Sequence, residues 1–160
     1  MAITPARLED LPAILALQRL AYQSEARLLN DNNIPPLRQT LDDLERELRT
    51  GTILKLTDDD GTILGSVRGH AQGEVFHIGK LMVHPAHQGK GYGSRLLAAM
   101  ERASGMAQFE LFTSDKSVRN IRLYERAGYV RVREEWVSPS LRFVFLQKKS
   151  ELEPIIQNTF

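Results

Sequence analysis

The segment 88–94, Gln-Gly-Lys-Gly-Tyr-Gly-Ser, contains three alternating glycines and has the clearest chemical meaning in this chain. It follows an apolar stretch typical of a buried strand and precedes a stretch with helical periodicity. Glycine accepts positive φ angles and lets a ligand approach the backbone. The first turn of a helix offers unpaired amides to an anion. The spacing therefore predicts a phosphate or pyrophosphate site, with a purely structural glycine turn as the alternative.

Other phosphate-binding and nucleophile motifs do not fit the chain. A dinucleotide fingerprint needs a third glycine, three residues after Gly91 or Gly93, where the chain has Ser94 and Leu96. A P-loop needs serine or threonine after Lys90, where the chain has glycine. The G-x-S-x-G elbow of serine hydrolases does not occur.

Composition excludes further classes of function. With 160 residues, 42% of them hydrophobic and 26% charged, the chain is typical of one globular domain. A net charge of +1 does not favour nucleic-acid binding, and no apolar run is long enough to span a membrane. We expect a cytoplasmic protein, because the amino-terminal segment lacks the pattern of a signal peptide. The absence of cysteine excludes thiolate chemistry, and His84 and His87 have no companion ligands, so we expect no metal.

Periodicity indicates which elements position the glycine turn. Asp10 is the expected cap of a first helix, residues 30–39 are expected to form a loop, and Gly79 suggests a bulge within an apolar strand. A helix after the glycine turn is expected to bury Leu96, Leu97, Met100 and Ala103. The expected strands cover 52–56, 62–67, 75–83, 109–113, 129–136 and 141–146, and the other helices cover 11–21, 41–50 and 118–127.

Two segments together resemble signatures of one family. Residues 83–93 resemble the acyl-CoA-binding motif of the GNAT superfamily of N-acyltransferases, whose pattern is Arg/Gln-x-x-Gly-x-Gly/Ala. Residues 117–129 resemble its second signature, an asparagine-bearing helix ending in Tyr-x-x-x-Gly-Phe/Tyr. The resemblance implies a mixed α/β domain over 1–148, followed by a tail over 149–160. Its sheet would be mostly antiparallel, with six or seven strands, helices on both faces and a parallel pair that splays at the CoA cleft.

The resemblance also implies a co-substrate, acetyl-CoA, and residues that bind it. Tyr124 would protonate the leaving thiolate. Many members have asparagine seven residues before this tyrosine, where this chain has Ser117, while its own asparagine is Asn120. Either residue would contact CoA, or Ser117 would only cap the helix. Backbone groups of Leu81, Met82 and Val83 would bind pantetheine, and Gln88, Gly89, Lys90, Gly91, Gly93 and Ser94 would surround the pyrophosphate.

The catalytic base and the acceptor pocket are less defined. Members with a base on the central strand place it eleven residues before the Arg/Gln of the CoA motif, which implies His77 here. Simple alternation would put His77 on the same face as Leu81 and Val83, unless a bulge intervenes. Glu74 is the rival base, and a half-buried strand residue is the alternative for His77. Tyr22 and Glu25 lie where the family builds its acceptor pocket, or else at an ordinary helix end.

The sequence thus favours an acetyltransferase that moves an acetyl group from acetyl-CoA to a primary amine. Direct attack in a ternary complex is expected, because no cysteine is present to form an acyl-enzyme. A non-catalytic acyl-CoA-binding module and a generic nucleotide-binding domain are the alternatives. The acceptor, a small molecule or a peptide, is not identified by the sequence. A homodimer is compatible with the tail, whose apolar residues are Leu152, Ile155, Ile156 and Phe160.

Overall fold

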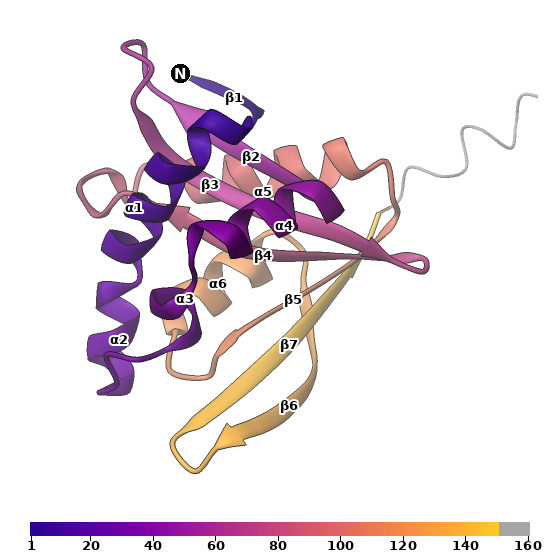
Figure 1. Ribbon diagram of the computed structural model, residues 1–160. Helices are drawn as coiled ribbons and strands as arrows, with labels where there is room; N and C mark the ends of the chain where they lie inside the picture. Colours follow the sequence, from indigo (N-terminus) through magenta and orange to yellow (C-terminus); the bar gives the residue numbers. More distant parts are fainter. Residues whose placement is uncertain (151–160) are drawn as a thin grey trace, which may run out of the picture.

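The chain is built on one seven-stranded sheet, which the computed structural model describes for residues 1–150 (Figure 1). The strands are β1 (Ala2–Pro5), β2 (Thr52–Thr57), β3 (Ile63–Gln72), β4 (Val75–Val83), β5 (Gln108–Ser114), β6 (Val130–Ser138) and β7 (Leu141–Lys149). Their order in the sheet is β1-β2-β3-β4-β5-β7-β6. Neighbours are antiparallel except β4 and β5, which are parallel. The expected mixed, mostly antiparallel sheet is confirmed.

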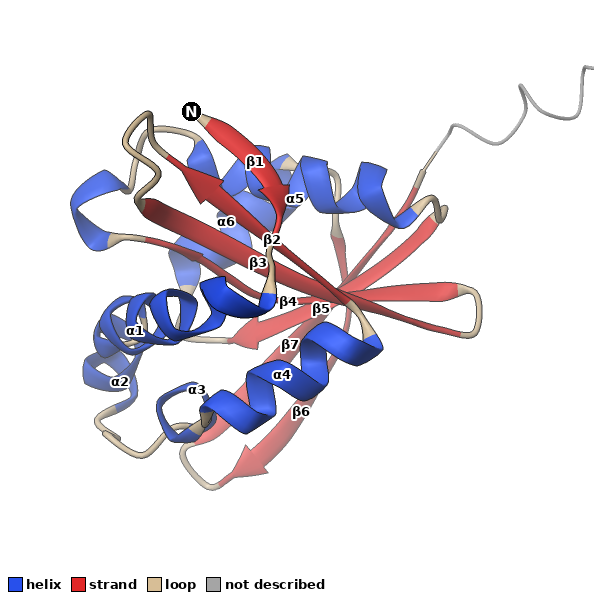
Figure 2. Ribbon diagram, turned by 45° about the horizontal axis from the view of Figure 1, so that its top comes forward, coloured by secondary structure: helices blue, strands red, loops and turns tan. Residues whose placement is uncertain are grey.

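Helices cover both faces of this sheet (Figure 2). They are η1 (Leu8–Asp10), α1 (Leu11–Ala21), α2 (Gln23–Leu29), α3 (Pro35–Arg38), α4 (Leu41–Thr50), η2 (Pro85–His87), α5 (Tyr92–Ser104) and α6 (Val118–Arg126). On one face α1 and α4 bury Leu11 and Leu44 against Ile53. On the other face α5 and α6 bury Leu96 and Ile121 within the larger core. Within residues 1–150, none of the helices has the length and apolar character needed to cross a membrane.

The central strand β4 contains a bulge. The register between β3 and β4 slips by one residue between the pairs Arg68–Gly79 and Ser66–Met82. Within the bulge, Lys80 has a φ of 50°, in the left-handed region that side-chain-bearing residues rarely adopt. The bulge suggested by Gly79 is therefore present, with the extra residue directly after the glycine.

This bulge reverses the alternation of side chains along β4. Phe76 and Ile78 before it, and Leu81 and Val83 after it, pack into the same core with α5 and α6. His77 is offset by one residue from Phe76 and Ile78, so it lies on the opposite face. The expectation from simple alternation, that His77 shares a face with Leu81 and Val83, is wrong for this reason.

Three smaller expectations are also corrected. The carboxylate of Asp10 does not cap α1, because it accepts a hydrogen bond from the Arg7 amide (2.8 Å) and pairs with the Lys55 ammonium (2.7 Å). The segment 30–39 contains α3, one helical turn that begins with two prolines in positions where proline is tolerated. Ala103 is exposed, whereas the other three residues expected to face inward from α5 are buried.

Candidate active site

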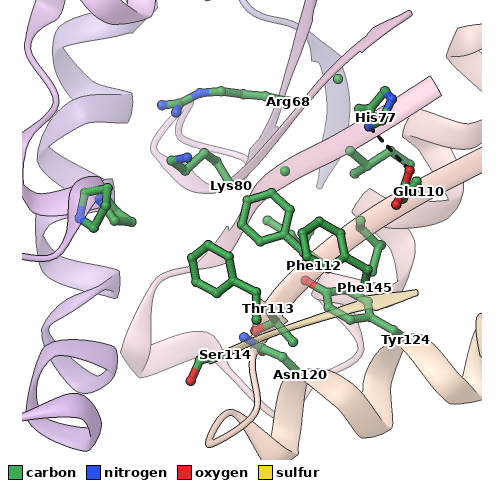
Figure 3. A pocket seen from close by; sticks show the side chains of 18 of the residues that line it. Arg68, His77, Lys80, Glu110, Phe112, Thr113, Ser114, Asn120, Tyr124 and Phe145 are labelled. Atoms are coloured by element: carbon green, nitrogen blue, oxygen red, sulfur yellow. Dashed lines mark ion pairs between the residues drawn. The ribbon is translucent and has the colours of Figure 1, made fainter. Parts of the chain in front are cut away.

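The parallel pair β4–β5 opens into a cleft. The two strands pair only through Val75–Gln108, Phe76–Phe109 and His77–Glu110, although both continue further along the chain. A cavity of about 640 Å³ occupies the opening, and residues of β3, β4, β5, β7, α2 and α6 line it (Figure 3). The splayed parallel pair that the resemblance implies is therefore present.

His77 lies where the two strands separate. Its Nδ1 is 4.0 Å from a carboxylate oxygen of Glu110 on β5, and its ring stacks on His70 of β3 at 5.4 Å. The other carboxylate oxygen of Glu110 is 2.7 Å from the guanidinium of Arg133. Glu110 was not found from the sequence, although a single carboxylate inside an apolar strand was an available signal. A cavity-lining imidazole beside a carboxylate is suited to accept a proton.

Glu74, the rival base, does not lie with these residues. It is exposed in the turn between β3 and β4 and is not part of the cavity lining. The structure therefore does not bring this carboxylate to the cleft.

Helix α6 contributes a phenol to the cavity. Tyr124 is buried within the core, and its hydroxyl group points into the cavity (Figure 3). Burial raises the pKa of Tyr124 above its usual value of 10.0, and the nearby acidic groups Tyr22 and Glu25 raise it further. Tyr124 is therefore protonated at neutral pH and is suited to donate a proton.

The structure separates the roles of the two polar residues on α6. Asn120 lies one helical turn before Tyr124 and also lines the cavity. Ser117 stands at the start of α6, but its hydroxyl does not cap the helix, because it donates a hydrogen bond to Glu25 of α2. Asn120 is therefore the residue that faces the cleft.

The amino-terminal helices form the wall opposite α6. Tyr22, at the junction of α1 and α2, and Glu25 both line the cavity. Burial raises the pKa of Tyr22 to about 12 and also raises the pKa of Glu25. Tyr22 and Glu25 therefore hold their protons more tightly than they would in water.

The glycine turn lies outside the cavity lining, between η2 and the start of α5. Gly89 and Gly91 have φ angles of 78° and 83°, and Gly91 begins α5 without a side-chain cap. The side-chain amide of Gln88 donates a hydrogen bond to the Val83 carbonyl (3.1 Å) and accepts one from the guanidinium of Arg119 on α6 (2.9 Å). Two positive φ angles, uncapped helical amides and a nearby arginine together make a site suited to an anion.

Other residues of the expected CoA site have distinct surroundings. Gly93 lies close to α6, because a Cβ there would approach the Leu123 side chain to 3.1 Å. Of the three β4 residues, Leu81 lines the cavity, whereas Met82 is buried and Val83 packs into the core. The remaining turn residues, Lys90 and Ser94, are exposed.

The cavity also contains residues that the sequence did not reveal. Arg68 of β3 is only 5% exposed and is held by Gln18, Gln39 and Glu47. Lys80 of the bulge projects from β4 into the same space (Figure 3). Aromatic residues of β5 and β7 form another wall, and these are Phe112, Phe143 and Phe145.

A proton acceptor and a proton donor thus line one cleft, and a candidate anion site lies outside its lining, between η2 and the start of α5. This arrangement suits transfer of a group from a phosphate-bearing donor, because the nucleophile must lose a proton and the leaving group must gain one.

Comparisons with known sequences agree with this arrangement. The profile of the acetyltransferase (GNAT) domain family matches residues 50–131, just over half of the chain. Mycothiol acetyltransferase of Kineococcus radiotolerans is 35% identical over 80 residues, covering 48% of this chain and 26% of that protein. An acetyltransferase of Yersinia pestis is 31% identical over 91 residues, covering 54% of this chain and 64% of that protein. The matches span less than two thirds of either relative.

Solved structures share the fold over nearly the whole chain. The ribosomal-protein-S18-alanine N-acetyltransferase of Escherichia coli superposes with a TM-score of 0.75 at 16% identity, covering 92% of each chain. The protein yncA of Salmonella typhimurium, solved with its cofactor acetyl-CoA, superposes with a TM-score of 0.69 at 21% identity, covering 93% of each chain. From the profile match and the shared fold, the chain belongs to the GNAT acetyltransferase family.

Proposed function

We propose that the chain transfers an acetyl group from acetyl-CoA to a primary amine by direct attack. The observation that carries this proposal is that His77 and Tyr124, a proton acceptor and a protonated phenol, line one cavity between separated parallel strands. Membership of an acetyltransferase family and the name of the S18-alanine N-acetyltransferase support the reaction type.

The residues present fit acetyl-CoA. Gly89, Gly91 and the first amides of α5 would hold the pyrophosphate, with Arg119 adding positive charge. Beyond His77 and Glu110, the facing edges of β4 and β5 do not pair with each other, so their peptide groups are available to the pantetheine amides. When bound, acetyl-CoA supplies a thioester carbonyl for the amine to attack.

His77 is the proposed general base. An alkylammonium has a pKa near that of lysine, about 10.4, so the acceptor must lose a proton before it attacks. His77 takes this proton directly or through a water, and Glu110 stabilises the resulting imidazolium from 4.0 Å. Arg133 holds Glu110 in place.

Tyr124 is the proposed general acid. As the nitrogen–carbon bond forms and the carbon–sulfur bond breaks, the phenol gives its proton to the departing sulfur. The ammonium gives up two protons in all. The first resides on His77, and the second leaves the nitrogen as the amide forms and returns to the Tyr124 phenolate directly or through a water. The proton from Tyr124 stays on the thiol, and His77 then releases its proton to water. The balance requires no acyl-enzyme, and the chain contains no cysteine to form one.

The test is a screen of primary amines that measures CoA release from acetyl-CoA and identifies the product by mass spectrometry. The expected result is CoA release that depends on an amine, together with one acetyl group on its nitrogen. Protein that binds acetyl-CoA but releases no CoA with amino acids, polyamines, aminoglycosides, peptides or lysine-rich proteins would instead be a non-catalytic acyl-CoA-binding module.

A further inference from the structure

Among residues 1–150, the Lys80 ammonium in the cavity has no ion-pair or side-chain hydrogen-bond partner. The lining contains three Lys or Arg side chains, of which Arg68 pairs with Glu47 (3.0 Å) and Arg133 pairs with Glu110 (2.7 Å). Lys80 makes no ion pair or side-chain hydrogen bond with any residue in the range 1–150. An unpaired cation in a partly buried position is unfavourable, so this ammonium is available to an anionic ligand.

The backbone directs this cation toward the cleft. Lys80 has a φ of 50° within the bulge, and strain of this kind concentrates at ligand sites. Burial lowers the pKa of Lys80, the charge of Arg68 lowers it further, and Glu47 partly opposes this. An anion bound beside the ammonium would offset that desolvation.

The aromatic wall lies on β5 and β7, and β5 is the strand that separates from β4, which carries Lys80. Phe112 of β5 is 48% exposed, with its ring 4.7 Å from Phe143 and 5.3 Å from Phe145. The guanidinium of Arg133 covers the Phe145 ring at 4.0 Å. Exposed aromatic rings that line a cavity favour an aromatic or large apolar group of a ligand.

We propose that the acceptor is a primary amine bearing both a free carboxylate and an aromatic or large apolar side chain, as an aromatic α-amino acid does. The carboxylate binds the Lys80 ammonium, the side chain packs on the wall of Phe112, Phe143 and Phe145, and the amine faces His77. This inference rests on the proposed function. A peptide amino terminus lacks the adjacent carboxylate and is therefore distinguished from a free amino acid.

The test compares kcat/KM for L-phenylalanine, L-phenylalaninamide, phenethylamine and L-alanine in a CoA-release assay. L-Phenylalanine is expected to exceed the amide and phenethylamine, which lack the carboxylate, by about tenfold or more. It is also expected to exceed L-alanine, which lacks the ring. Lys80→Met is expected to remove the preference for the carboxylate, while Lys80→Arg retains the preference. Lys149→Met is the charge-matched control, because Lys149 is exposed at the end of β7 and outside the cavity.

The outcomes separate this inference from the proposed function. Equal or better turnover of the amide or phenethylamine overturns the inference, as does an unchanged preference in Lys80→Met, while amine acetylation stands. Turnover of other amines but not of L-phenylalanine also overturns the inference, while amine acetylation stands. If no amine of any class releases CoA from protein that binds acetyl-CoA, the proposed function fails as well.

Discussion

Tyr124 is the residue whose surroundings define its chemistry most clearly. Its phenol is buried, its pKa is raised by that burial, and its hydroxyl faces the cavity. Because a CoA thiol is about as acidic as cysteine, with a pKa near 8.5, expulsion of a bare thiolate is difficult but not prohibitive. The acid is therefore expected to assist the reaction without being indispensable.

Tyr124→Phe is expected to lower kcat by about 10²-fold, with little change in acetyl-CoA affinity. The substitution removes only the hydroxyl and keeps the ring that packs in the core. Steady-state kinetics and calorimetric titration with acetyl-CoA measure the two effects. A wild-type kcat in this variant would reduce Tyr124 to a packing residue.

His77 has a distinct signature in the pH dependence of the rate. Because a protonated imidazole cannot accept a further proton, kcat/KM is expected to fall at acidic pH. His77→Ala is expected to lose at least about 10²-fold in kcat/KM at pH 8 and to flatten that acid limb. Glu74→Gln is the control, since this carboxylate is exposed in a turn away from the cavity. If the fall of kcat/KM at acidic pH were lost in Glu74→Gln but kept in His77→Ala, Glu74 and not His77 would be the base.

The ionisation of Glu25 affects the stability of the folded protein. Burial raises the pKa of Glu25 above its usual value of 4.5, so the folded state holds this proton more tightly than the unfolded state does. The free energy of unfolding therefore decreases as the pH rises from 4.5 through the folded pKa. Below pH 4.5 both states are protonated and the penalty is absent.

Glu25→Gln removes this penalty and keeps an oxygen to accept the Ser117 hydrogen bond. Its Tm is expected to exceed that of the wild type at pH 7.5, with a difference that shrinks toward pH 4. Glu9→Gln, an exposed carboxylate on η1, is the matched control. A Tm of Glu25→Gln at pH 7.5 equal to or below the wild-type value would contradict the expected stabilisation.

At the scale of elements, the glycine turn before α5 can be tested against a second glycine that has the same φ angle. Gly91→Asp is expected to abolish the stabilisation by acetyl-CoA, because it places an anion beside the amides that would hold the pyrophosphate. Gly61, in the turn between β2 and β3, shares the φ of 83° and has equally open surroundings, so Gly61→Asp carries the same backbone strain away from the site.

Thermal denaturation with and without acetyl-CoA measures the difference. At 100 times the dissociation constant the ligand stabilises the wild type and Gly61→Asp by about 2.7 kcal/mol. Equal stabilisation of Gly91→Asp would contradict the placement of the pyrophosphate. Gly93→Asp is a poorer probe, because its side chain would collide with Leu123 and disturb the contact between α5 and α6.

The sequence was informative about elements whose signal is local. The glycine turn, the positions of six of the seven strands and the helix carrying Tyr124 follow from periodicity and glycine spacing. The sequence did not indicate β1 or α2, and β3 continues to Gln72, beyond the expected 62–67. The sequence suggested the bulge at Gly79 and its possible effect on the alternation, but not its size. One extra residue after Gly79 reverses the side-chain alternation and places His77 on the other face from Leu81 and Val83. Likewise, the proline-rich segment 30–39 contains a helical turn, because its two prolines stand in the first turn, where proline is tolerated.

At the scale of the whole molecule, the cavity is assembled from residues far apart in the sequence. Arg68, Lys80 and Glu110 come from three strands, and Glu25 comes from a helix in the first third of the chain. No spacing rule joins such positions, so the sequence indicated the glycine turn and, on the acceptor side, Tyr22 and Glu25, but not Arg68, Lys80 or Glu110. The tail residues expected to contact the domain or a second subunit lie outside the described range, so the homodimer stays a prediction.

The measurement that tests the central claim most directly is the initial rate of CoA release with acetyl-CoA and a productive amine varied together. Direct attack predicts intersecting lines in the double-reciprocal plot, no release without the amine, and no acetyl group on the protein by mass spectrometry. Parallel lines, with one acetyl group retained on the chain in the absence of amine, would contradict the account.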